Sequence, residues 1–246
     1  MRASSEPYAV GVVLAAGVGS RVGADGNKAY LQVGERAMVA WSLDTLAEVA
    51  DIARIVLVYR QGERGLAEDT VAREVPTAAV EFVEGGASRH ASERNVLKYL
   101  APDIEAGSID VVLIHDAARP VAGRDMFVSA VSVARGFGGA IPALPLPDVV
   151  GSAGRIDPSR RTERLVRVQT PQAFRAAALL QAYRAADRQR FEGTDTSSCI
   201  EAFTDLEVHT FAGDQRNIKV TYARDIAVAE HLLADRVSSN PDAGSR

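Results

Sequence analysis

Short apolar runs that alternate with segments of helical periodicity constrain the fold of this chain more than any other feature. Five such runs, rich in valine, isoleucine and leucine, occupy residues 10–16, 55–59, 80–83, 111–114 and 140–144. Runs of this length without polar alternation are typical of parallel strands that are buried on both faces. Strands separated by helices predict an α/β fold, a mostly parallel sheet with helices on both faces. In such a sheet, ligands gather at the carboxyl ends of the strands.

Apolar spacing and turn residues predict the other helices and strands. Apolar spacing indicates helices over residues 37–50, 61–75, 124–135 and 225–234, and a further helix with Ser92 as its candidate N-terminal cap. Pro171 is expected to open a helix that runs through Tyr183, and a polar turn leads into a helix containing Cys199. Further strands are expected over residues 165–170, 208–211 and 218–221. We expect a single domain over residues 1–237, with a projecting arm at 148–166, and a disordered tail at 238–246.

The composition excludes several classes of protein. The 246 residues are 47% hydrophobic, enough for a substantial core, but no run approaches the roughly 20 apolar residues of a membrane helix. The first residues lack the apolar core of a signal peptide, so we expect a cytoplasmic protein. A single cysteine excludes an internal disulfide framework and a cysteine-rich metal site. A net charge of −4 argues against a nucleic-acid partner, so any phosphate site must be built from a few aimed cations.

A glycine-rich segment follows the first apolar run. It carries two cations, Arg21 and Lys28, among glycines at positions 17, 19, 23 and 26. Glycines let the backbone turn sharply and bring its N–H groups close to an anion, so the segment predicts a phosphate site. It matches neither common fingerprint, because Ala29 replaces the P-loop serine or threonine and Val22 replaces the third dinucleotide glycine. Taken alone, the segment is also compatible with an ordinary glycine-rich turn.

Other polar groups follow later apolar runs. Gly86 comes soon after run 80–83, Asp116 and Arg119 follow run 111–114, and Lys219 lies far along the chain. We expect the strand-end groups to converge with the glycine-rich segment at one edge of the sheet. The set suits a nucleoside triphosphate and a second anion, with Asp116 as a ligand for Mg²⁺. As alternatives, Arg119 could simply pair with Asp116, and Lys219 could be a surface lysine.

Five motifs occur in order along the chain, namely LAAGVGSR with Lys28, HDAARP at 115–120, TPQAF at 170–174, TDTSS at 194–198 and NIKVT at 217–221. Together they resemble the 2-C-methyl-D-erythritol 4-phosphate cytidylyltransferase family of the non-mevalonate isoprenoid pathway. The resemblance implies a Rossmann-like nucleotidyltransferase fold and a homodimer held by projecting arms. It also implies Mg²⁺-dependent transfer of CMP from CTP to methylerythritol phosphate, which gives the CDP-alcohol and pyrophosphate.

The resemblance assigns roles to single residues. The cations that would stabilise the α-phosphorus are Arg21, Lys28 and Lys219. CTP would lie on a backbone cradle formed by Ala15, Ala16, Gly17 and Gly19, with its cytosine at Gly86 and Ser92. The acceptor would be bound by Asp116, which also takes the metal, and by Arg119, Arg161, Thr170 and Thr194.

Several positions depart from the family pattern. The family usually has proline before the loop lysine and often glutamine after it, where this chain has Asn27 and Ala29. The arm carries Val149 for threonine and Thr162 for arginine, a role that Arg161 could take by a shift of one residue. Thr196 replaces a second acid. Two alternatives therefore stay open: another polyol phosphate as acceptor, such as ribitol 5-phosphate, or a nucleotide-binding paralogue with little or no activity.

Overall fold

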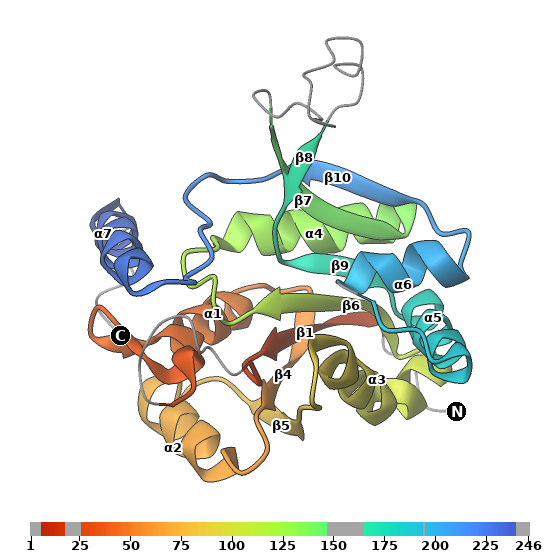
Figure 1. Cartoon of the computed structure of the whole chain (residues 1–246), viewed down its shortest axis with the longest axis horizontal. Helices are drawn as coiled ribbons and strands as arrows, with labels where there is room; N and C mark the ends of the chain where they lie inside the picture. The colour runs from red at the N-terminus through yellow and green to blue at the C-terminus, as the bar shows by residue number, and fades with distance from the viewer. Residues whose placement is uncertain (1–5, 18–25, 147–164, 194, 240–246) are drawn as a thin grey trace, which may run out of the picture.

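The computed structural model describes residues 6–17, 26–146, 165–193 and 195–239 (Figure 1). Outside these ranges lie nearly all of the expected arm and four of the expected site residues, Gly19, Arg21, Arg161 and Thr194. Within the described ranges, no helix is long and apolar enough to cross a membrane.

A central sheet of eight strands, all within the described ranges, organises the chain. The strands are β1 (Tyr8–Leu14), β4 (Ile52–Tyr59), β5 (Val80–Glu84), β6 (Ile109–Asp116), β7 (Gly139–Pro145), β8 (Val166–Val168), β9 (Gln172–Arg175) and β10 (Val208–Ala212). Their order is β10-β7-β9-β6-β1-β4-β5, and β8 pairs with the end of β7. Parallel pairing joins β1 to β4 and β6, β4 to β5, and β7 to β10, whereas β8 and β9 run antiparallel to their neighbours. The predicted mostly parallel sheet is confirmed.

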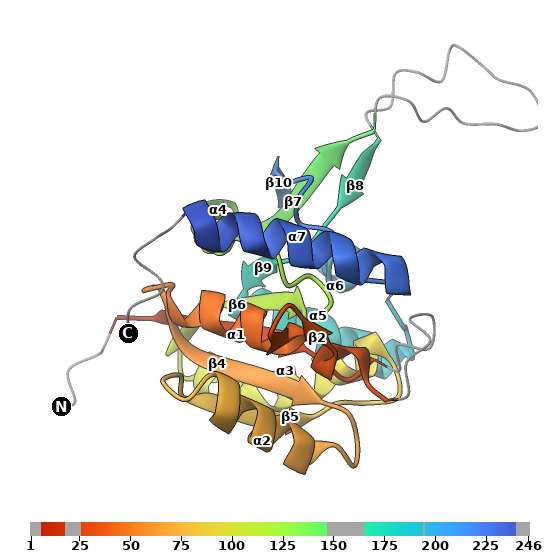
Figure 2. The ribbon, with the colours of Figure 1, turned by 90° about the vertical axis from the view of Figure 1, so that its left-hand side faces the viewer.

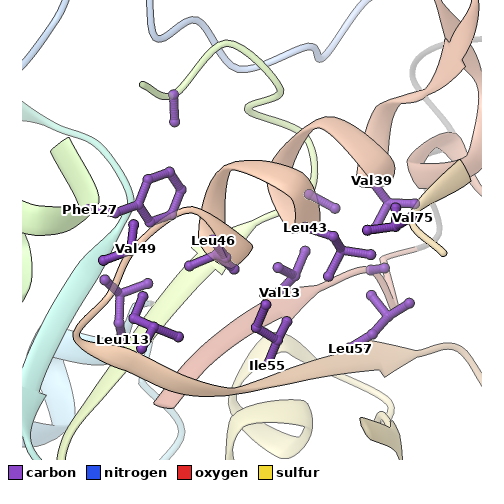
Figure 3. Packing of buried hydrophobic residues seen from close by; sticks show 14 of the residues in the cluster. Val13, Val39, Leu43, Leu46, Val49, Ile55, Leu57, Val75, Leu113 and Phe127 are labelled. Carbon is purple, nitrogen blue, oxygen red and sulfur yellow. The ribbon is translucent and has the colours of Figure 1, made fainter. Parts of the chain in front are cut away.

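Helices cover both faces of this sheet, as predicted. They are α1 (Met38–Ala47), α2 (Arg64–Glu74), α3 (Arg89–Glu105), α4 (Arg124–Phe137), α5 (Ala176–Gln189) and α6 (Thr196–Phe203). Leu43 and Leu46 of α1 face Val13 and Leu113 of the sheet, next to Phe127 of α4 (Figure 3). A second cluster joins α3, α5 and α6 to the opposite face. Alternate residues of β1 enter the two clusters, which is why its sequence reads as an unbroken apolar run.

A smaller cluster attaches the C-terminal helix α7 (Ala223–Ser239) to the start of α1, to the segment before it and to the turn after β6. Between the glycine-rich segment and α1 lie the short elements η2 (Lys28–Tyr30), β2 (Gln32–Val33) and β3 (Arg36–Ala37). In Figure 2, α7 runs beside β2, and Ala229 of α7 packs in one cluster with Met38 and Val220. The helix extends to Ser239, two residues into the segment 238–246 that we expected to be a disordered tail, and the tail stays a prediction. The assignment of residues 1–237 to one domain stays a prediction.

The helix after the second glycine turn begins earlier than predicted. Ser88 has an extended backbone (φ −132°, ψ 171°), and its Oγ caps α3 by accepting a hydrogen bond from the N–H of Ala91 at 3.1 Å. Ser92 lies one turn inside the helix, where its Oγ donates to the carbonyl of Ser88 at 2.9 Å. The predicted cap at Ser92 is therefore wrong.

Two predictions in the C-terminal half are also wrong. Residues 172–175 form β9, and the helix that we expected from Pro171 begins at Ala176. Because β9 lies between β6 and β7 and buries Gln172 through Phe174, its pairing on both sides outweighs the helical pattern. Residues 218–221 form no strand pair in the part of the chain that the structure describes. The N–H of Val220 instead donates to the carbonyl of Ala118, in the turn after β6, at 2.8 Å.

Candidate active site

A cavity of about 260 Å³ opens at the carboxyl ends of β1, β5 and β6. Most of the expected site residues in the described ranges line it, namely Ala15, Ala16, Gly17, Lys28, Gly86, Ser92, Asp116 and Lys219. These residues come from segments as far apart in the chain as Ala15 and Lys219, and the sheet topology brings them together. The convergence that we predicted for the strand-end groups is confirmed for Gly17, Gly86 and Asp116.

Asp116, the last residue of β6, is the charged centre of the cavity. Its Oδ2 accepts from Nζ of Lys219 at 2.7 Å, and its Oδ1 forms an ion pair with Arg89. Burial alone would raise the pKa of this carboxyl, but the charges of Arg89 and Lys219 hold it well below its usual range. Asp116 is therefore ionised at neutral pH, and each of its oxygens contacts a cation.

Arg89 has no role in the sequence analysis, yet it lines the cavity between two acids. It is the first residue of α3, and its Nε lies 3.0 Å from Oε1 of Glu93 one turn further on. Burial would lower the pKa of this guanidinium, but Asp116 and Glu93 raise it above its ordinary value. A cation just after a glycine turn, as Arg21 is after Gly17, was the sequence signal that could have identified it.

Glu93 is the hub of a buried polar network behind Arg89. Its side chain is 1% exposed and accepts hydrogen bonds from Oγ1 of Thr196 at 2.8 Å and from the hydroxyl of Tyr183. Burial raises the pKa of Glu93, and the nearby charge of Arg89 opposes that rise. Thr196 stands where the resemblance leads one to expect an acid, and the structure places an acid from α3 directly against it.

Lys28 and Lys219 enter the cavity from opposite ends of the sequence. Lys28 is the first residue of η2, and its Nζ donates to the carbonyl of Val220 at 3.1 Å. The segment 219–220 thus carries one cation and binds the other. This contact explains how a lysine so late in the chain comes to share a site with the glycine-rich segment.

The turn between β5 and α3 requires its glycines. A Cβ added to Gly86 would lie 2.4 Å from Cβ of Ala91, and one added to Gly85 would lie 2.5 Å from Cβ of Ala16. The N–H of Gly86 donates to Oγ of Ser92 at 3.0 Å. The turn is therefore packed closely against both α3 and the end of β1, which fixes one wall of the cavity.

Thr170 and Arg119 do not line this cavity; they lie behind it. Oγ1 of Thr170 accepts from the N–H of Asp116 at 3.1 Å and lies 3.2 Å from Nδ1 of His115. Arg119 donates through Nη1 to the carbonyl of Asn217 at 2.7 Å, and no ion pair joins it to Asp116 among the described residues. Its buried Nε has no hydrogen-bond partner, and burial lowers the pKa of its guanidinium.

A divalent cation fits the cavity only together with a ligand that supplies oxygens. Asp116 is the one carboxylate among the described residues that line it, and the described ranges contain no cluster of three or more histidines, cysteines or acids. Mg²⁺ in phosphate-transfer sites typically takes one or two carboxylates, with phosphate oxygens and waters completing its shell. The donor set therefore fits a magnesium ion that binds with a triphosphate.

The chain matches one family model over nearly its whole length. The family model for 2-C-methyl-D-erythritol 4-phosphate cytidylyltransferase matches residues 9–235. The chain belongs to this family. Its members are nucleotidyltransferases, and the family resemblance seen in the five sequence motifs is confirmed.

Individual relatives cover nearly the whole chain. The cytidylyltransferase of Cereibacter sphaeroides is 37% identical over 225 residues, which is 91% of this chain and 96% of the relative. That of Geobacillus kaustophilus is 35% identical, over 92% of this chain and 97% of the relative. Among solved structures, 4-diphosphocytidyl-2C-methyl-D-erythritol synthase from Anaerococcus prevotii superposes with a TM-score of 0.77 at 28% identity, covering 93% of this chain and 96% of that chain. The Thermus thermophilus cytidylyltransferase gives 0.67 at 32% identity, covering 92% and 98%.

Proposed function

We propose that the chain transfers the cytidylyl group of CTP to 2-C-methyl-D-erythritol 4-phosphate and releases pyrophosphate, a step of the non-mevalonate route to isoprenoid precursors. Membership of the family supports the activity, since its members are named for this reaction. The observation that carries the proposal within the structure is the placement of Lys28, Arg89 and Lys219 around one cavity at the strand ends.

The reaction needs charge placement more than proton transfer. An oxygen of the acceptor phosphate attacks the α-phosphorus of CTP, a new P–O bond forms, and the bond to the β-phosphate oxygen breaks with its electrons leaving on pyrophosphate. A phosphate monoester is largely dianionic near neutrality, because its second pKa is about 6, so it needs no strong general base. His115 is unsuited to that role: it is fully buried behind the cavity, and burial lowers its pKa to about 4.

Lys28 and Lys219 stabilise the negative charge that develops on the oxygens of the α-phosphorus. Arg21 is proposed for the same work, from the resemblance. From the resemblance, the backbone of residues 15–17 and 19 is proposed as the cradle for the triphosphate, and Gly86 and Ser92 are proposed to recognise cytosine.

Mg²⁺ completes the proposed nucleotide site. When bound, it would neutralise charge on the phosphates, with Asp116 as its protein ligand. Because Asp116 contacts both Arg89 and Lys219 in the structure, Lys219 is well placed to exchange the carboxylate for a phosphate oxygen when a nucleotide enters.

The acceptor side is assigned by resemblance and by position. Asp116 and Arg119 would hold the acceptor phosphate, with Arg161, Thr170 and Thr194 as further contacts. For Thr170 the geometry favours an indirect role, because its hydroxyl supports the backbone of Asp116. The homodimer, the cytoplasmic location and the lack of a nucleic-acid partner stay predictions. The altered residues Val149, Thr162 and Thr196 favour a second candidate, transfer to another polyol phosphate such as ribitol 5-phosphate.

The test is pyrophosphate release by the full chain with Mg²⁺. CTP is compared with ATP, GTP and UTP, and each nucleotide is paired with methylerythritol phosphate or ribitol phosphate. Release with CTP and methylerythritol phosphate is the expected result. Release with ribitol phosphate alone would replace the first function by the second. No release with any pair would leave only a nucleotide-binding role.

A further inference from the structure

A buried asparagine joins the two ends of the glycine-rich segment. Asn27 is 5% exposed, and its Nδ2 donates to the carbonyl of Ala15 at 2.5 Å and to Oε2 of Glu63 at 2.7 Å. Its Oδ1 accepts from the N–H of Ala29 at 3.0 Å. One side chain therefore connects the end of β1, the turn before α2 and the start of η2.

These contacts fix the backbone from which Lys28 projects. The Asn27 side chain caps η2, and the Asn27 carbonyl accepts from the N–H of Tyr30 at 3.1 Å. Because Ala15 belongs to the expected triphosphate cradle, its bond to Asn27 also sets the separation between cradle and lysine. The far end of Lys28 is held by the carbonyl of Val220. The lysine is thus located at both its backbone and its amine.

Glu63 determines which way the amide of Asn27 points. A carboxamide can turn by half a revolution and exchange its donor and acceptor ends. A carboxylate and a backbone carbonyl both face Nδ2, so the turned amide would put an oxygen against two acceptors. The other oxygen of Glu63 lies 3.7 Å from Arg60, and the side chain is 19% exposed. The orientation that caps η2 is therefore the one that Glu63 selects.

We propose that Asn27, oriented by Glu63, is a positioning residue that aims Lys28 at the α-phosphorus of the nucleotide. The inference rests on the proposed function, and it adds two residues whose effect on the reaction runs through the lysine. The lysine is held in place although no proline precedes it. The buried amide of Asn27 donates two hydrogen bonds and accepts a third, and together these bonds fix the backbone just before Lys28.

The kinetic test compares variants in pyrophosphate release with CTP. Asn27→Ala should lower kcat/KM by about 10- to 100-fold, the scale of a small misplacement of a catalytic group. Glu63→Gln should lower it less, because glutamine keeps an acceptor oxygen. Asn95→Ala is the matched control: its half-buried side chain donates to the carbonyl of Glu84 outside the cavity lining, and its activity should stay normal. Normal activity of Asn27→Ala would overturn the proposal.

A double variant separates positioning from general damage. If Asn27 acts through Lys28, adding Asn27→Ala to Lys28→Ala should cost no more than about twofold, because residues that act as a unit are non-additive. An equal fold-loss in both backgrounds would show that Asn27 acts elsewhere, and it would overturn the proposal.

Hydrogen exchange gives a readout that is independent of activity. The Ala29 amide donates to Oδ1 of Asn27, so Asn27→Ala should speed its exchange, whereas Asn95→Ala should not. Unchanged protection at Ala29 in Asn27→Ala would overturn the proposal. If the wild-type chain releases no pyrophosphate, the proposed function fails, and exchange at Ala29 still decides whether Asn27 holds this segment.

Discussion

Replacement of Arg89 by glutamine should destabilise the protein far more than the loss of an ordinary surface arginine. The Arg89 side chain is 26% exposed, but the two acids that it contacts, Glu93 and Asp116, are only 1% and 9% exposed. Removing one partner from a buried ionic cluster leaves charge without compensation, and such losses are typically about 3–5 kcal/mol. A Coulomb estimate agrees, since unit charges about 4 Å apart interact by about 4 kcal/mol at an effective dielectric constant near 20.

Two features keep the expected loss within that range. Asp116 retains the contact with Lys219 at 2.7 Å, so it is not left alone. Glu93 can take up a proton while keeping its hydrogen bonds with Tyr183 and Thr196, since burial already raises its pKa. For a chain of this length, a loss of about 3–5 kcal/mol corresponds to a melting temperature lower by roughly 6–20 °C.

The assay is chemical denaturation with calorimetry, and Arg94→Gln is the matched control on the same helix. Arg94 pairs with Asp187 at 2.8 Å, but the two side chains are 48% and 60% exposed, so its loss should cost less than about 1 kcal/mol. Equal losses for the two variants would refute the argument from burial.

The pH dependence provides a second check on the same variant. In Arg89→Gln, the lowered pKa of Asp116 moves up toward its unfolded value of about 3.9, and the raised pKa of Glu93 moves further above about 4.3. The change at Asp116 removes stability above about pH 3.9, and the change at Glu93 removes stability above the pKa that Glu93 already has in the wild-type protein. The difference from wild type should therefore be largest near pH 7 and shrink as pH falls below about 4. A difference that does not vary with pH would contradict the assigned electrostatics.

Three further predictions concern other parts of the site. Lys28→Ala should lower turnover at least about a hundredfold, the scale of one preorganised charge contact, whereas the exposed Lys98→Ala should not; near-normal turnover would refute the role of Lys28. His115 is neutral in the folded state because burial lowers its pKa from 6.5 to about 4. Wild type should therefore lose about 3 kcal/mol more than His115→Gln as pH falls from 7 to 4, measured by urea denaturation, because only the unfolded histidine takes up a proton in that range. Gly86→Ala should cost about 1–3 kcal/mol through overlap with α3, whereas Gly65→Ala, where an added Cβ meets nothing within 4 Å, should cost nothing; equal effects would show that the turn can relax.

The strands that carry the site could be predicted because one physical property determines both their sequence and their place. A strand segment buried on both faces must be apolar throughout, so residues 10–14 of β1, 55–59 of β4 and 111–114 of β6 each read as an unbroken run. The residue after such a run in a parallel sheet lies at the ligand-binding edge. Gly17 and Asp116 were found in this way.

The wrong or missing predictions share a different property: they depend on partners far along the chain. β9 was read as helix because Gln172 through Phe174 precede a good helix-forming stretch, and only pairing with β6 and β7 makes them a strand. Arg89 and Glu93 received no role from the sequence, because nothing local marks them as buried. Their burial comes from β6, α5 and α6, which no local pattern reveals.

Two departures from the family pattern therefore have a common physical explanation. At position 27 a side chain with three hydrogen bonds occupies the place where a proline is usual, and at position 196 a threonine bonds an acid that comes from α3. In each case a buried polar side chain holds a cation in place. Asn27 caps the segment that begins at Lys28, and Glu93 forms an ion pair with Arg89. Cations in fixed positions matter most for a reaction in which negative charge develops on the oxygens around phosphorus in the transition state. The side chains around them can change as long as another buried polar group restores the geometry. The same question applies to Val149 and Thr162, which lie within 147–164: does an arginine near them still bind the acceptor? Steady-state kinetics of Arg161→Ala and Arg160→Ala would answer this question. If Arg161 contacts the acceptor, only Arg161→Ala should raise the KM for the acceptor.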